Sequence, residues 1–176
     1  MDFEKFPKMA RISRNCIITE KIDGTNAQIA FNEDGDMFVG SRKRWITPED
    51  DNYGFAAWCR DNKEELSKLG PGRHYGEWWG CGIQRKYGLD KKVFSLFNTG
   101  RWNDGNKPEC CEVVPVLWHG VFNADVIEKC LSDLVENGSK AAPGFMNAEG
   151  IVIYHQAAGV GFKKTILKDE MPKGLT

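Results

Sequence analysis

The sequence lacks long hydrophobic runs and any strong excess of charge. No window approaches the roughly 20 apolar residues of a membrane-spanning helix, and no apolar signal region follows residues 1–5. We therefore expect a protein without membrane association that stays in the cytoplasm. The formal net charge of −1 comes from 24 Lys and Arg against 25 Asp and Glu, and it argues against general coating of nucleic acid.

Metal-binding patterns of cysteine and histidine are also missing. Six cysteines are present, but no two have the Cys-x-x-Cys spacing. We interpret them as reduced, buried thiols and do not expect a structural zinc. The histidines His74, His119 and His155 lie far apart, so packed strand positions explain them better than metal ligation.

No internal repeat, low-complexity tract or linker interrupts the chain, so residues 1–176 are predicted to form one domain. Strand-like segments outnumber helical ones. Strands are expected over 16–21, 26–31, 37–42, 73–80, 92–98, 113–118, 149–154 and 160–167, and helices over 53–69 and 123–138. This pattern predicts an α+β fold built on antiparallel sheets flanked by helices.

One stretch, Thr-Glu-Lys-Ile-Asp-Gly-Thr-Asn over residues 19–26, suggests a nucleophile. Lys21 ends a β-branched run and precedes an expected glycine turn at Asp23-Gly24. A lysine side chain ordinarily titrates near 10.4, so a nucleophilic one needs burial or neighbouring cations to lose its proton. Taken alone, Lys21 could equally be a solvated residue before a hairpin turn.

Other segments could supply partners for Lys21. The hairpin formers of 32–36 should bring Arg42 back toward the Lys21 turn. In 73–80, Gly76 and Gly80 surround Glu77, and either the close approach of a ligand or a bulge would explain glycines there. The neighbouring Trp78-Trp79 pair fits sheet packing better than base stacking.

Basic residues form three clusters, and their meaning depends on the fold. They would make a phosphate track if brought together and solvated faces if not. The clusters are Arg42-Lys43-Arg44, Arg85-Lys86 with Lys91-Lys92, and Lys163-Lys164 with Lys168.

Together, the spaced motifs resemble the covalent nucleotidyltransferase superfamily of polynucleotide ligases and capping enzymes, and most closely ATP-dependent RNA ligases of the RNA ligase 2 type. The resemblance runs from residue 20 to residue 163. It rests on Glu-Lys-Ile-Asp-Gly-Thr-Asn at 20–26, Ser-Arg at 41–42, Tyr-Gly-Glu at 75–77, Val-Phe-Ser-Leu-Phe at 93–97, Glu-Gly-Ile-Val at 149–152 and Phe-Lys at 162–163. It implies a nucleotidyltransferase (adenylation) domain.

The resemblance implies that Lys21 attacks the α-phosphate of ATP, forming a lysyl-adenylate and releasing pyrophosphate. Arg42 and Lys163 would then meet phosphate charge, and Glu149 would hold a divalent metal, Mg²⁺ or Mn²⁺. Arg42, Lys163 and the metal would also be the cations that help Lys21 to lose its proton.

The resemblance also implies an adenosine site. Glu20 would accept a hydrogen bond from the adenine amine, and Phe97 would stack on the adenine ring, although core filling is an alternative for Phe97. Glu77 and Asn26 would hold the ribose or the reactive phosphate region.

Asn26 favours RNA joining, because related DNA ligases usually carry arginine at that place. The implied sequel transfers AMP to an RNA 5′-phosphate, which a 3′-hydroxyl then attacks. The expected partners are RNA ends, in a nicked duplex or a single strand. The alternatives are a DNA ligase or capping-type enzyme, and a non-catalytic module that binds nucleic-acid ends.

The chain departs from the family pattern in two ways. The last motif is usually Lys-x-Lys, whereas here it reads Lys163-Lys164-Thr165, so the second lysine is either replaced by Thr165 or displaced in register. The sequence also ends soon after this motif. We therefore expect no OB domain or other C-terminal domain, and either a minimal ligase or one that needs an accessory RNA-binding subunit.

Overall fold

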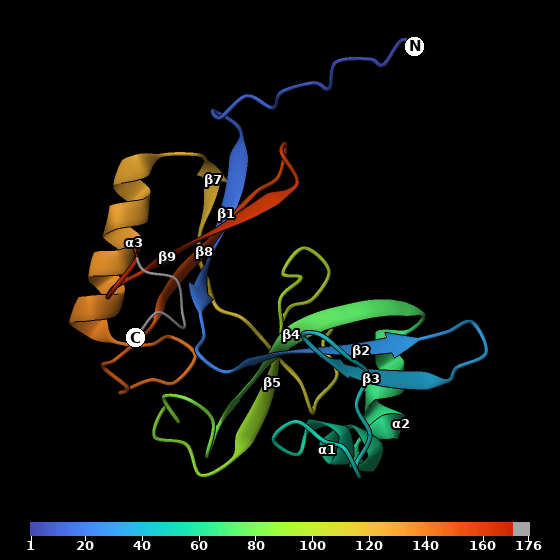
Figure 1. Ribbon diagram of the computed structural model, residues 1–176. Coiled ribbons are helices and arrows are strands. Elements are labelled where there is room, and N and C mark those ends of the chain that lie inside the picture. The colour runs from blue at the N-terminus through green and yellow to red at the C-terminus, as the bar shows by residue number, and fades with distance from the viewer. Residues whose placement is uncertain (171–176) are drawn as a thin grey trace.

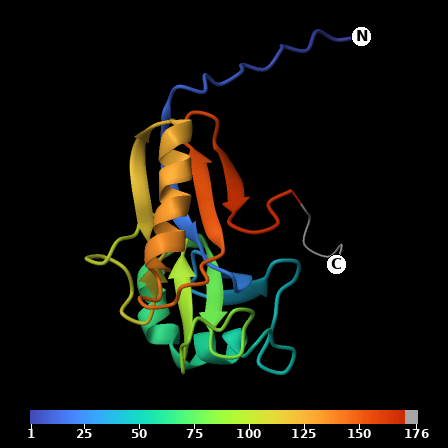
Figure 2. The same ribbon diagram turned by 90° about the vertical axis from the view of Figure 1, so that its left-hand side faces the viewer.

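The computed structural model describes residues 1–170 and consists of two β-sheets, each covered by helix on one face (Figure 1). The four-stranded sheet has the order β7-β1-β8-β9 and is entirely antiparallel. Its strands are β1 (Asn15–Lys21), β7 (Val116–Val121), β8 (Gly150–His155) and β9 (Val160–Thr165), and α3 (Ala124–Asn137) packs against it. Figure 2 shows α3 lying along this sheet.

The five-stranded sheet has the order β3-β2-β4-β5-β6, and β5 and β6 form its only parallel pair among the described residues. Its strands are β2 (Thr25–Phe31), β3 (Met37–Ser41), β4 (Gly72–Gly80), β5 (Lys92–Leu96) and β6 (Glu112–Val113). It is covered by α1 (Phe55–Asp61), α2 (Lys63–Leu66) and a 3₁₀ turn (Ser67–Leu69). These two sheets confirm the predicted α+β fold.

Each sheet has its own apolar core on the helix-covered face. In the four-stranded sheet, Ile18 and Ile151 pack against Leu134 of α3. In the five-stranded sheet, Trp78 and Phe94 pack against Phe55 of α1. Because side chains alternate along a strand, the other residues of β1, β2, β4 and β8 face away from the helices.

The boundaries of α3 follow the predicted capping residues. The side chain of Asn123 accepts a hydrogen bond from the Asp125 amide, which satisfies one of the free N–H groups at the helix start. Gly138 ends the helix with a φ of 77°, a conformation that costs glycine little.

Two predicted elements are divided. The helix expected over 53–69 is interrupted at Asn62, which follows α1 and precedes α2. The strand expected over 113–118 breaks at Pro115, which has no N–H to donate to a ladder. Its two halves, β6 and β7, belong to different sheets, and the Pro115 carbonyl accepts a hydrogen bond from the Glu20 amide.

Three side chains are more exposed than predicted. Val135 of α3 is 52% exposed and does not belong to the apolar stripe, and Cys81 lies at the surface. His119 is exposed on β7, opposite Ile17, on the face of the sheet that alternation turns away from α3. His74 and His155 are buried strand residues, as predicted.

Residues 22–24 join the two sheets, because β1 and β2 belong to different sheets. The alternative in which Lys21 is a solvated residue before a hairpin turn is therefore wrong. Gly24 is needed for close approach: a Cβ at this position would lie 2.4 Å from the Trp78 carbonyl oxygen. Gly76 has a similar reason, since its Cβ would lie 2.4 Å from the Ser95 carbonyl oxygen on β5. The neighbouring strand therefore accounts for Gly76, and neither the ligand nor the bulge explanation is needed.

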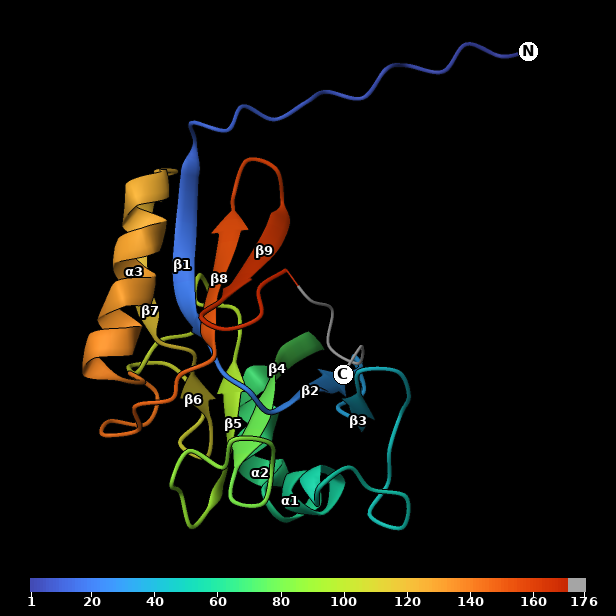
Figure 3. The same cartoon turned by 60° about the vertical axis from the view of Figure 1, so that its left-hand side comes forward.

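Residues 1–14 precede β1, and Figures 1 and 3 show this segment running outward from the two sheets. Over residues 1–170, no helix is long and apolar enough to cross a membrane.

Candidate active site

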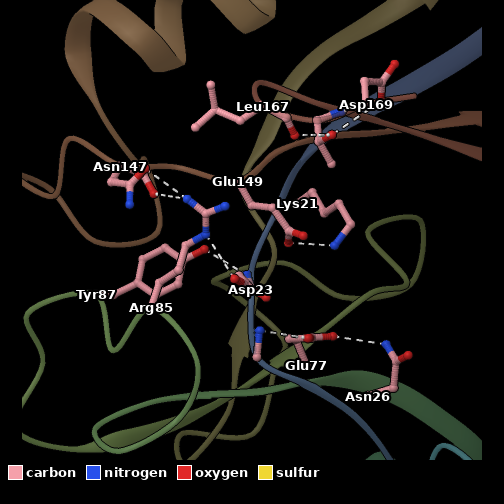
Figure 4. A network of polar contacts seen from close by, with 12 residues as sticks. Lys21, Asp23, Asn26, Glu77, Arg85, Tyr87, Asn147, Glu149, Leu167 and Asp169 are labelled. Atoms are coloured by element: carbon pink, nitrogen blue, oxygen red, sulfur yellow. Dashed lines mark hydrogen bonds and ion pairs between the residues drawn. The ribbon is translucent and has the colours of Figure 1, made fainter. Parts of the chain in front are cut away.

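Lys21 lies at the junction of the two sheets. It is the last residue of β1, and the chain crosses to β2 immediately after it. Its Nζ is 2.6 Å from Oε2 of Glu149, the residue before β8 (Figure 4). The Glu149 side chain is 2% exposed and that of Lys21 is 19% exposed, so the ion pair is largely shielded but open to solvent at the lysine.

The contact with Glu149 differs from the expected surroundings of Lys21. The sequence predicted neighbouring cations, whereas the nearest charged group to the Lys21 amine is the carboxylate of Glu149. Glu149 therefore holds and orients the Lys21 side chain.

The pairing register of β1, β8 and β9 shows whether the second lysine of the last motif is replaced by Thr165 or displaced in register. Lys21 pairs with Gly150 and Gly150 with Thr165, while Thr19 pairs with Val152 and Val152 with Lys163. Lys163 and Thr165 thus lie on the same face of the sheet as Lys21.

Lys164 lies on the opposite face, where its Nζ is 3.6 Å from Glu128 of α3. The second lysine of the motif is therefore replaced by Thr165, and the alternative of a displaced register is wrong. The Thr165 hydroxyl donates to the Leu167 carbonyl.

Glu77 and Asn26 come from the five-stranded sheet, where β4 pairs with β2 and the two residues are direct partners. One carboxylate oxygen of Glu77 accepts from the Gly24 amide at 3.0 Å, and the other accepts from the Asn26 side-chain amide at 3.0 Å (Figure 4). Glu77 is therefore tied to the segment that connects Lys21 to β2.

Burial raises the pKa of Glu77 from 4.5 to about 7, against the opposing effects of the Gly24 amide and of Lys21. Between these two values, the folded protein keeps a proton that the unfolded chain has lost. The free energy of unfolding should therefore fall as pH rises through this window, by up to about 3 kcal/mol.

We expect Glu77→Gln to remove this pH dependence. Its amide can retain both hydrogen bonds if the Asn26 amide turns over. The variant should match the wild type near pH 4 and gain relative stability as pH rises to 8, as measured by urea unfolding across that range. The other carboxylates titrate in both proteins and cancel in the difference, so parallel stability curves would contradict the assignment.

Phe97 and Arg42 lie further along the same face of the five-stranded sheet. The Phe97 amide donates to the Tyr75 carbonyl, and its side chain is 41% exposed, which excludes the core-filling alternative. Ser41 pairs with Ala27, so Arg42 follows the end of β3 beside the Asn26 end of β2. The register thus places Arg42 beside the Asn26 part of the motif.

Glu20 points to the helix-covered side of β1 and is 1% exposed. One carboxylate oxygen accepts from the Ser139 hydroxyl, and the other accepts from the amides of Lys140 and Ala141. These three donors make Glu20 the anchor of the loop that follows α3. They leave acceptor capacity for a base chiefly on the oxygen bound to Ser139.

The sequence did not predict a second set of contacts around Asp23. Arg85 donates from Nε to Asp23 at 2.9 Å and from Nη1 to both the backbone and the side chain of Asn147 (Figure 4). The Tyr87 hydroxyl accepts from the Asp23 amide at 2.7 Å. This network fixes the segment after Lys21 to the segment before Glu149. In the sequence, Arg85 stood out only as part of the basic pair Arg85-Lys86, which does not identify Asp23 as its partner.

Cations from each of the three basic clusters already have structural partners. Arg44 binds Asp50, Arg85 binds Asp23, and Lys164 lies near Glu128. Only part of the basic surface predicted from the sequence is therefore available as a phosphate track.

Glu149 is the residue that could hold a metal at this site. Over residues 1–170, no group of three or more His, Cys, Asp or Glu side chains could bind a metal ion by itself. Mg²⁺ often uses only one or two protein carboxylates together with substrate phosphates and water. The donor set thus fits a metal that arrives with a nucleotide and does not fit a permanent metal cage.

The geometry defines a two-sheet α+β domain that presents a lysine–carboxylate pair where its sheets meet. The family model described as RNA ligase matches residues 14–168, and the chain belongs to this family. A comparison with curated proteins gives no match.

Several solved structures of a Naegleria gruberi RNA ligase have a similar fold. An arginine-to-alanine variant with ATP and Mn is 22% identical with a TM-score of 0.63, and a lysine-to-methionine variant with AMP and Mn is 21% identical with a TM-score of 0.62. In both, the match covers 88% of this chain and 50% of that chain. This chain therefore spans about half the length of those proteins, and at these identities the likeness establishes the fold.

Proposed function

We propose that the protein is an ATP-dependent RNA ligase that joins a 3′-hydroxyl to a 5′-phosphate through a lysyl-adenylate. The observation that carries the proposal is the position of Lys21, 2.6 Å from Glu149 at the junction of two sheets in a chain of the RNA ligase family. The Naegleria enzyme, whose structures contain ATP or AMP with Mn, supports ATP as the nucleotide and a divalent metal as cofactor.

In the first step, the neutral amine of Lys21 attacks the α-phosphate of ATP. A phosphorus–nitrogen bond forms at Nζ, the bond to the β-phosphate oxygen breaks, and pyrophosphate leaves. Glu149 orients the amine, and the ammonium proton passes to water at the solvent-exposed side of Lys21 before the attack. AMP then passes from Lys21 to the RNA 5′-phosphate, where the 3′-hydroxyl displaces it.

The remaining predicted residues have roles that fit their positions. Phe97 offers an exposed ring for adenine, while Glu77 and Asn26 face the nucleotide as a hydrogen-bonded pair. Lys163 and Arg42 are exposed cations on the two site-facing surfaces and would contact phosphates. Glu20 shapes the loop after α3 and would contact adenine only through its remaining acceptor position.

Glu149 would hold Mg²⁺ or Mn²⁺ together with phosphate oxygens and water. The bound metal would supply positive charge that stabilises the phosphate during attack. We further propose a single domain over 1–176, cytoplasmic location and RNA ends as partners. An accessory RNA-binding subunit remains a prediction, which copurification with the native protein would test.

The test compares four nicked duplexes that differ only in whether the 3′-hydroxyl strand and the 5′-phosphate strand are RNA or DNA. With ATP and Mg²⁺ or Mn²⁺, we expect covalent labelling of the protein by α-labelled ATP and sealing of the all-RNA nick in preference to the all-DNA nick. Preference for an all-DNA nick would favour a DNA ligase, and labelling by GTP alone would favour a capping-type enzyme. Absence of any covalent adduct would reject the proposal.

A further inference from the structure

The site-facing surface of the five-stranded sheet extends well beyond the residues assigned to ATP. Alternation and register put Asn26, Gln28 and Ala30 of β2 on one face with Glu77, Tyr75 and Arg73 of β4. Phe38 of β3 pairs with Ala30 and joins the same face. A continuous strip therefore runs from the Glu77–Asn26 pair toward the end of the β2–β3 hairpin.

Exposed aromatic rings are concentrated along this strip. Tyr75, Phe38 and Trp45 are 53%, 46% and 47% exposed, whereas Trp78 and Trp79 of the same domain are almost completely buried. The Phe38 and Trp45 rings are 5.8 Å apart and inclined at 51°. These rings lie outside the buried core, so packing of the fold does not account for their size.

Arginine is interleaved with the rings. The Arg73 guanidinium lies 5.3 Å from the centre of the Trp45 ring, within the range of a cation–π contact, and its Nη1 donates to Gln28. Arg42 and Lys43 are exposed in the loop that leads from β3 to Trp45, while Arg44 is held by Asp50. The strip therefore presents flat rings together with uncommitted positive charge.

A hollow of about 370 Å³ opens at the far end of the strip, with Phe38, Trp45 and Arg73 in its wall. Small-ligand sites typically measure about 300–1,000 Å³, so the hollow can accept a planar group such as a base. Arg73 is four residues from Glu77 along β4, a distance of about 13 Å at roughly 3.3 Å per residue. A stacked strand rises about 3.4 Å per nucleotide, so about four nucleotides would span the distance from the hollow to Glu77.

We propose that Trp45, Phe38 and Arg73 form a binding site for unpaired RNA bases near the end that is being joined. The aromatic rings stack on bases, and Arg73, Arg42 and Lys43 contact the intervening phosphates. This combination of stacking rings and cations is typical of sites for single-stranded nucleic acid. The proposal rests on the proposed function for the identity of the ligand, and continuity with the Lys21 site favours RNA over a protein partner.

The test measures the affinity of the full chain for a fluorescent, 5′-phosphorylated single-stranded RNA by anisotropy, without ATP. We expect Trp45→Ala to weaken binding by about 10-fold or more and Trp45→Phe to retain most of it, because stacking needs only an aromatic face. Phe162→Ala, which removes an exposed ring from β9, is the matched control and should bind as the wild type. Arg73→Gln should reduce the slope of log affinity against log salt by about one.

Self-adenylylation of each variant, which involves no RNA, is measured in parallel. Wild-type labelling with unchanged RNA affinity in Trp45→Ala would reject the strip and leave the ligase proposal standing. Absence of labelling in the wild type would reject the ligase proposal itself. If Trp45→Ala changes only the sedimentation of the protein, the strip is an interface between copies of the chain and the RNA assignment is wrong.

Discussion

Lys21→Ala should abolish self-adenylylation. We expect a loss of roughly 10⁶-fold, the order seen when the nucleophile of a covalent mechanism is removed. The measurement is incubation with α-labelled ATP and a divalent metal, followed by denaturing electrophoresis. Lys21→Arg should fail equally, because arginine stays protonated although it preserves the charge opposite Glu149.

Two controls separate chemistry from folding in this experiment. Lys164→Ala is the first control. Lys164 follows Lys163 but lies near Glu128 on the opposite face of the sheet from Lys21, so this variant should be labelled normally. Lys21→Ala should also still seal RNA whose 5′ end already carries AMP, since that step no longer needs a lysine nucleophile. Covalent label in Lys21→Ala would show that another residue accepts AMP and would overturn the assignment.

Local sequence patterns predicted most helices and strands, because the residues within each element were enough to identify it. The Asn123 cap, the apolar spacing and Gly138 define α3, and alternation defines β1, β2 and β4. The predictions were wrong where contacts between distant segments determine the boundaries of an element. In the segment over 113–118, Pro115 marks an interruption in the sequence, but nothing local shows that the two halves belong to different sheets.

The glycines show the same limit. Gly24 and Gly76 were conspicuous in the sequence, but their reason is the approach of another strand, at Trp78 and Ser95 respectively. A glycine in the sequence shows that a side chain is absent, but it does not show which neighbouring group occupies the space. The sequence left ligand approach and a bulge as two explanations for Gly76, and the structure supplies a third, the close approach of β5.

The site residues were predicted by family motifs, and the structure adds what each one touches. Glu20 and Glu77 are both buried carboxylates, but one anchors a loop and the other binds the segment after Lys21. Arg85 and Tyr87 belong to no motif, and their contacts with Asp23 join segments that are far apart in the sequence. The Lys163-Lys164-Thr165 question likewise needed the β8–β9 register.

Glu149→Gln provides the sharpest test of how Lys21 is controlled. We expect adenylylation to fall by about 100-fold or more at fixed metal concentration, because the protein loses the carboxylate that would hold the metal at the reacting phosphate. Raising Mg²⁺ or Mn²⁺ should recover part of the rate. Gln keeps an oxygen that can accept from Lys21 but loses the opposing charge, so thermal unfolding is measured in parallel to show that the variant is folded at the assay temperature.

If Glu149 serves only to hold the Lys21 side chain in place, the opposite result is expected. Replacing its carboxylate by an amide would then release the amine without slowing the attack. Glu128→Gln changes a glutamate that lies near Lys164 on the far face and serves as the matched control, with an unchanged rate. If the Glu149→Gln variant is faster than the wild type and insensitive to added metal, other groups bind the metal. The role of Glu149 is then only to hold the Lys21 side chain.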